Sequence, residues 1–233
     1  DLMVIRDPYV ILGLVILAVL VLVSISKMPQ KKGDGITDSL GETFAKLKAN
    51  STYTLGVSSQ VLYVGAQIMC WTYIYQYAEA IGMSSDTAAN YQFIAFILFF
   101  FGRALGTYLL QFFPSGKLLM LYALFAIFAT IGVIFIEGIF GLYCLVAITL
   151  FMSIMFPTIY GIALEGMSEE ESKIGAAGLV MAIVGGALMP KLQGMLIDLG
   201  GFGVNDIKIL GVSEVNFSFM LPMLCFVFIA FYG

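Results

Sequence analysis

Histidine is absent from this sequence, and charged residues are few. Without histidine there is no histidine-ligated metal site, no serine–histidine–aspartate triad and no histidine proton relay. Charged residues make up 11% of the 233 residues, where a soluble domain has about 25%, so there is no room for a soluble catalytic domain. We expect a protein that is not an enzyme, with no metal, no cofactor and no nucleic-acid partner.

Cysteine is also scarce. Cys70, Cys144 and Cys225 fall in three different apolar segments and lack the paired spacing of a disulfide framework or a metal site. We expect them to pack as small apolar side chains and to form no disulfide.

Long apolar runs dominate what is present: 61% of the residues are hydrophobic, and the mean hydropathy is +1.00. A helix of about 20 apolar residues crosses the roughly 30 Å hydrocarbon core of a bilayer. The sequence predicts an all-α integral membrane protein with seven transmembrane helices, over residues 9–26, 53–78, 87–113, 118–136, 138–164, 174–190 and 215–233.

The basic residues predict the orientation of these helices. If the polar segment 27–48 is cytoplasmic, alternation places eight of the 11 basic residues inside and leaves only Arg6, Lys191 and Lys208 outside. Because cytoplasmic loops are enriched in Lys and Arg, the N-terminus is expected outside and the C-terminus inside. The chain begins with Asp1 and ends in apolar sequence, so we expect it to be part of a longer protein.

The second predicted helix carries polar and aromatic side chains at helical spacing, namely Gln60, Tyr63, Gln67 and Trp71. An amide without a partner in hydrocarbon costs several kcal/mol, so this face should turn toward other helices or a water-filled cavity. Gln67 and Trp71 are one turn apart, about 6 Å. This pair could grip one hexose, with the amide on two hydroxyls and the indole against the ring. Interhelical hydrogen bonding is the alternative.

The fifth predicted helix carries a second group of candidate sugar-binding residues, which would form a second wall of the cavity. Ser153, Phe156 and Tyr160 lie on one stripe, and Pro157 interrupts the backbone hydrogen bonds, which predicts a kink and suggests a hinge. Asn90, at the start of the third helix, is a further candidate for the cavity.

Gly102, Arg103 and Gly106 lie near the inner end of the third helix. Glycines four residues apart allow another helix to approach closely, and Arg103 beside them could latch that helix in one gate state. The alternative is an arginine that only extends to the lipid headgroups.

Seven helices are also typical of membrane receptors, so a receptor or a membrane scaffold is the alternative class. The linker of about twenty residues sets the first helix apart, which favours six helices plus one. Ile68-Met69-Cys70-Trp71-Thr72 and Ile154-Met155-Phe156-Pro157-Thr158 match at three of five positions, as expected for the inverted three-plus-three repeat of a transporter half.

Several motifs resemble one transporter family. The segment 102–107 with 113–117 looks like the loop between helices eight and nine of the major facilitator superfamily. The fucose/proton symporters, and the related glucose/galactose permeases, are similar in four stretches: Tyr63-Val64-Gly65-Ala66-Gln67 with Trp71, Ala88-Ala89-Asn90-Tyr91, Phe151-Met152-Ser153 with Phe156-Pro157-Thr158-Ile159, and Val184-Gly185-Gly186 with Pro190.

The resemblance implies a proton-coupled sugar symporter of a bacterial inner membrane that works by alternating access. It implies that 1–26 is the last helix of an N-terminal half, 27–52 a cytoplasmic linker and 53–233 the C-terminal six-helix bundle. The family's proton-binding Asp and Glu lie in the five missing helices, and no predicted span here has an ionisable group near its centre. Relatives carry Tyr where this chain has Phe156, which removes a hydroxyl from the sugar wall.

Overall fold

A computed structural model describes residues 2–26, 40–200 and 208–233, which form two units, Asp1–Thr37 and Asp38–Gly233. The first unit contains one helix, α1 (Leu2–Ile25). It begins before the predicted start at residue 9 and includes Asp7 and Pro8. The described side chains of α1 are exposed.

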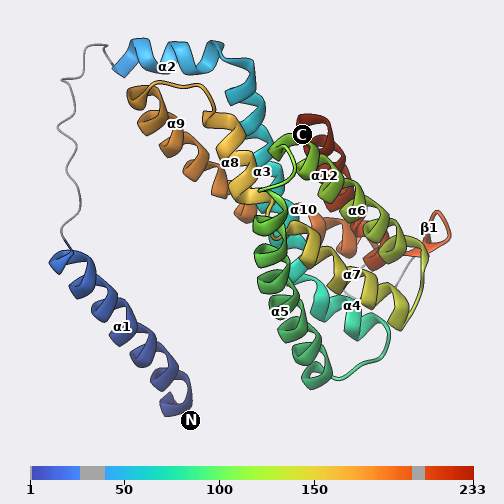
Figure 1. The fold of residues 1–233 in the computed structure, drawn as a ribbon. Coiled ribbons are helices and arrows are strands. Elements are labelled where there is room, and N and C mark those ends of the chain that lie inside the picture. The colour runs from blue at the N-terminus through green and yellow to red at the C-terminus, as the bar shows by residue number, and fades with distance from the viewer. Residues whose placement is uncertain (1, 27–39, 201–207) are drawn as a thin grey trace. The chain divides into compact units, whose positions relative to one another are not determined.

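The second unit is almost entirely helical (Figure 1). Its elements are α2 (Leu40–Ala49), α3 (Ser51–Thr72), α4 (Ile74–Ala80), α5 (Ser85–Leu109), α6 (Ser115–Phe135), α7 (Ile139–Met152), α8 (Met155–Leu164), α9 (Glu169–Met181), η1 (Ala182–Val184), α10 (Gly185–Ile197), η2 (Asp198–Gly200), β1 (Lys208–Ile209), β2 (Val212–Ser213), α11 (Glu214–Ser218) and α12 (Met220–Tyr232). The small hairpin of β1 and β2 is an addition to the predicted all-α fold; its turn holds Leu210 and Gly211 at positive φ.

Five helical stretches of this unit are long and apolar enough to cross a membrane: 85–109, 115–135, 139–164, 169–197 and 214–232. The 22-residue helix α3 is not among them, because its serine, glutamine and tyrosine side chains lower its hydropathy. In α1, the apolar part Tyr9–Ile25 falls in a shorter class.

Helix α3 is the centre of the second unit and packs against α8, α10 and α12. Glycines make this packing close: a Cβ at Gly185 of α10 would overlap the carbonyl of Val61 on α3. Glycine at this position therefore lets α3 and α10 approach each other closely. At one end of α3, helix α2 lies beside α9 (Figure 1).

Four tyrosines along α3 and α4 donate hydrogen bonds to backbone carbonyls of other parts of the bundle. The acceptors are Gly175 for Tyr53 (3.1 Å), Met152 for Tyr63 (2.9 Å), Pro190 for Tyr73 (2.8 Å) and Ile136 for Tyr77 (3.2 Å). A phenol buried away from water needs such a partner. These bonds therefore tie the central helix to four different segments.

Four of the predicted helices are interrupted within the described residues. The second breaks at Tyr73 between α3 and α4, the fifth at Ser153 and Ile154 between α7 and α8, the sixth at η1 between α9 and α10, and the seventh at Phe219 between α11 and α12. A break was predicted only in the fifth, from Pro157. Pro157 has no N–H to donate to the carbonyl of Ser153, four residues earlier, and the helix is interrupted at that point.

Candidate functional site

The four side chains on the polar face of α3 differ in how deeply they are buried. Gln60 and Tyr63 are fully buried at 0% exposure, whereas Gln67 and Trp71 are only partly buried. One turn before Gln60, α3 lies close to α8 and α12, since a Cβ at Gly56 would lie 2.6 Å from the Cβ of Ala163 and 2.7 Å from the hydroxyl of Tyr232. Gln67 and Trp71 are the two of these four side chains with accessible surface.

Trp71 is held by two aromatic rings of α5. Its ring centroid lies 5.1 Å from that of Phe96 and 5.2 Å from that of Phe99, both in edge-to-face arrangements. Its indole N–H is buried and has no hydrogen-bond partner among the described residues. This packing fixes the indole in place and leaves its N–H without a protein acceptor.

The break between α7 and α8 contains the candidate residues of the second wall. Ser153 is buried and its hydroxyl donates to the carbonyl of Leu150 at 2.6 Å. Phe156 and Tyr160 are partly buried, and Pro157 is exposed. The ring of Phe156 meets that of Tyr63 edge to face at 6.2 Å. At this break, a residue of α8 therefore contacts the polar face of α3, two groups of residues that the sequence predicted separately.

The glycines of α5 meet the same break from another side. A Cβ at Gly102 would lie 2.6 Å from the carbonyl oxygen of Leu150 and 2.8 Å from the hydroxyl of Ser153. A Cβ at Gly106 would overlap the side chain of Ile154. The close approach expected from this spacing is confirmed, and its partner is the broken helix.

Arg103 and Asn90 are exposed on α5. The guanidinium carbon of Arg103 lies 5.7 Å from the ring centroid of Phe99, a cation–π contact within its own helix. Among the described residues, no hydrogen bond or ion pair joins Arg103 to a neighbouring helix in this conformation. Nor does a hydrogen bond or ring contact join Asn90 to the other candidates within these ranges.

Sequence reasoning missed a group of buried polar side chains at the start of the last predicted helix. Glu214, Asn216 and Ser218 are buried, and the Ser218 hydroxyl accepts a hydrogen bond from the amide of Gln193 at 3.0 Å. The amide of Asn216 donates to the carbonyl of Val133 at 2.8 Å. Four polar residues within 213–218, directly before an apolar run, were the available signal.

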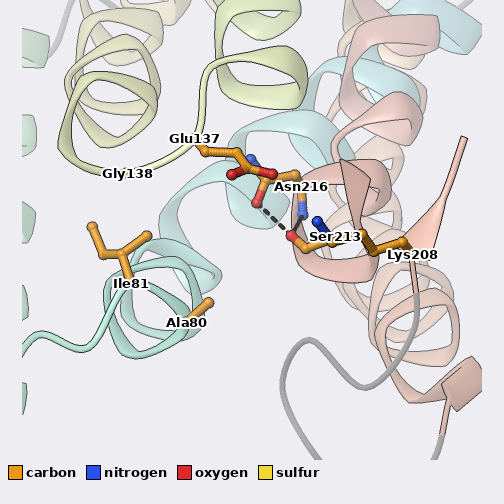
Figure 2. Close-up of a pocket in the computed structure, with 7 residues that line it drawn as sticks. All are labelled: Ala80, Ile81, Glu137, Gly138, Lys208, Ser213 and Asn216. Carbon is orange, nitrogen blue, oxygen red and sulfur yellow. Dashed lines mark hydrogen bonds between the residues drawn. The ribbon is translucent and has the colours of Figure 1, made fainter. Parts of the chain in front are cut away.

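A cavity of about 500 Å³ adjoins this group. Figure 2 shows Ser213 and Asn216 joined by a 2.6 Å hydrogen bond at its wall. Glu137 and Lys208 bring opposite charges to the lining, together with Ala80, Ile81 and Gly138. None of the predicted sugar-binding residues lines it, so it is separate from the site around the helix break.

No family model matches the sequence. The chain is 48% identical over its full length to the L-fucose-proton symporter of Haemophilus influenzae, of which it covers 53%. It is 30% identical to the L-fucose-proton symporter of Escherichia coli over 95% of this chain and 49% of that protein. A glucose/galactose transporter of Brucella abortus is 29% identical over 98% of this chain and 53% of that protein.

Solved structures agree with these relatives. A crystal structure of the E. coli fucose:proton symporter superposes with a TM-score of 0.84 at 30% identity, covering 97% of this chain and 54% of that one. A major facilitator superfamily transporter in the outward conformation gives 0.82 at 31% identity, with 97% and 53% covered. The chain spans about half the length of the proteins it matches.

The helical fold, the apolar helices and these matches define the class: a multi-pass membrane protein that resembles transporters and is not an enzyme. More narrowly, the chain is similar over nearly its whole length to half of the L-fucose-proton symporters and of a transporter of the major facilitator superfamily.

Proposed function

We propose that the chain is the C-terminal half of a proton-coupled sugar symporter that carries L-fucose, or a related hexose, by alternating access. The observation that carries this proposal is the 48% identity over the whole chain to an L-fucose-proton symporter. The weaker match to a glucose/galactose transporter, at 29%, supports glucose or galactose as the second candidate.

In this proposal, residues 1–26 are the last helix of an N-terminal half, 27–52 a cytoplasmic linker and 53–233 six transmembrane helices in two sets of three. The first helix of each set is α3 with α4, or α7 with α8; one breaks at Tyr73 after the 22 residues of α3, and the other at Ser153 and Ile154 after the 14 residues of α7. The match of 68–72 with 154–158 at three of five positions supports the three-plus-three arrangement, with seven crossings in all.

The proposed location is the inner membrane of a bacterium, with the first residue outside and the last inside, as the distribution of Lys and Arg favours. Coupling to protons is assigned to the N-terminal half. Sugar contacts are assigned here to Gln67 and Trp71 on α3 and to Phe156 and Tyr160 on α8. Asn90 is placed at the edge of this proposed sugar site.

Uptake by the complete protein in proteoliposomes tests the function. An inward proton gradient should drive saturable accumulation of labelled L-fucose, and a protonophore should abolish the accumulation while leaving sugar exchange intact. Saturable accumulation of glucose or galactose in place of fucose would select the second candidate. No saturable uptake of any of the three sugars would refute the proposal.

Arg103 is proposed to latch a neighbouring helix in one gate state, because it lies between Gly102 and Gly106 where α5 meets the broken helix. Arg103→Ala should then change the transport rate while equilibrium sugar affinity stays within a few-fold. Arg103→Lys should fail as well, since Lys lacks the planar fork of donors. Normal proton-driven uptake and counterflow in both variants would exclude the latch.

A further inference from the structure

The hydroxyl of Tyr63 lies at the point where the fifth predicted helix is interrupted. It donates a 2.9 Å hydrogen bond to the carbonyl of Met152, the last residue of α7, and both residues are fully buried. The last carbonyls of a helix have no partner within the helix and need a donor from elsewhere. Tyr63 supplies that donor from a different helix, 89 residues away in sequence.

The rest of the break is enclosed. The ring of Tyr63 packs edge to face on Phe156, at 6.2 Å and 66°. On another side, α5 comes so near at Gly102 that a Cβ there would lie 2.6 Å from the carbonyl oxygen of Leu150. The break therefore has a hydrogen-bond donor on α3 and a close steric wall on α5.

Direct contact between Tyr63 and a sugar, which the helical spacing suggested, fits this geometry poorly. The side chain has 0% exposure, and its hydroxyl proton is used by Met152. Gln67, one turn further along α3, is the nearest amide on this face that is partly accessible.

We propose that Tyr63 is a positioning residue. Its hydroxyl keeps the backbone between α7 and α8 in its interrupted conformation, and this conformation orients the side chains of Phe156 and Tyr160 toward Gln67 and Trp71. Tyr63 itself does not touch the sugar. The role in sugar positioning rests on the proposed function, whereas the hold on the break stands on the hydrogen bond alone.

Tyr63→Phe in the complete transporter tests this, because the substitution keeps the ring and removes only the hydroxyl. Tyr53→Phe is the matched control. It also deletes a buried hydroxyl that donates to a backbone carbonyl from α3, at 3.1 Å, but its acceptor is Gly175 on α9. Amide hydrogen exchange over 150–158, equilibrium sugar affinity and the rate of sugar exchange are measured for both variants and the wild type.

Tyr63→Phe should speed amide exchange over 150–158 at least fivefold and change the sugar exchange rate at least threefold, with sugar affinity within threefold of wild type. Tyr53→Phe should leave amide exchange over 150–158 unchanged. Wild-type amide exchange there in Tyr63→Phe overturns the proposal, as does an equal acceleration in both variants. A tenfold loss of affinity with unchanged amide exchange would make Tyr63 a direct sugar contact and also overturn it. If the wild type binds no sugar, the proposed function fails, and amide exchange alone still decides whether Tyr63 holds the break.

Discussion

Gln60 is buried in α3, and neither its amide nitrogen nor its amide oxygen has a hydrogen-bond partner among the described residues. A buried polar group left without a partner costs about 1–3 kcal/mol. Its neighbour Ser59 is also buried with an unpartnered hydroxyl in the same part of the chain. Two adjacent residues with buried, unpartnered polar groups therefore lower the stability of the folded protein.

Gln60→Met should therefore raise the thermal stability of the purified protein, because it keeps a side chain of similar length and removes the amide. The gain should be about 1–3 kcal/mol in the free energy of unfolding, measured by thermal melts in one detergent. Gln193→Met is the control: its amide nitrogen donates to Ser218 at 3.0 Å and only its oxygen lacks a partner among the described residues, so its loss should bring a smaller gain. A lower melting temperature for Gln60→Met would show that its amide is satisfied in solution.

Helical spacing placed Gln60, Tyr63, Gln67 and Trp71 on one face of α3, and the structure explains why their environments differ. Periodicity depends only on the local helix. Burial along the face depends on α5, which packs on Trp71, and on α8, α10 and α12, which begin more than eighty residues after α3 ends. Sequence could identify the face, but not which part of it the other helices cover.

At the scale of elements, α5 and the broken helix are in closest contact at two glycines. Gly102→Ala should destabilise the protein by about 1–3 kcal/mol, because the new Cβ would lie 2.6 Å from the carbonyl oxygen of Leu150. Gly161→Ala is the matched control: this glycine is in α8, and a Cβ there would meet nothing within 4 Å. It should be neutral or slightly stabilising, since Ala favours helix over Gly.

Thermal melts of both variants provide the measurement. Equal melting temperatures for Gly102→Ala and the wild type would mean that the two helices are further apart than the structure shows. A large loss in Gly161→Ala as well would point to a general intolerance of alanine in these helices.

The elements themselves were predictable in position and less so in their ends. The sixth predicted helix was expected to start at residue 174, the beginning of its apolar run, but α9 starts at Glu169. A capping box of Ser168 and Glu171 begins the helix inside the acidic segment. The kink near Pro157 was expected from the missing N–H, whereas the breaks at Tyr73 and at η1 have no proline beside them.

The linker predicted over 27–52 contains a short helix. The structure has α2 over Leu40–Ala49, with Glu42 in its first turn and Lys46 and Lys48 in its last. This charge order suits the helix dipole. The part of the linker at 27–39 lies outside the described residues, so its predicted character stays a prediction.

At the scale of the whole molecule, composition predicted a membrane protein, and the motifs predicted the resemblance to fucose-proton symporters that the comparisons confirm. Seven crossings, the inverted repeat and the orientation stay predictions, because α1 and the second unit are described separately. Sugar identity was not readable from this chain, since hydroxyl stereochemistry is read jointly by the walls of both halves.

The central claim is that Gln67 and Trp71 form the sugar-facing core of this half. They are the accessible members of the polar face of α3, and Trp71 is fixed by Phe96 and Phe99. Isothermal titration of L-fucose into the complete transporter tests the claim most directly. Gln67→Ala should weaken binding by about 1–3 kcal/mol, roughly 5- to 150-fold, because sugar hydroxyls lose their partner, and Trp71→Ala should weaken it as well. Wild-type affinity in both variants would contradict the claim.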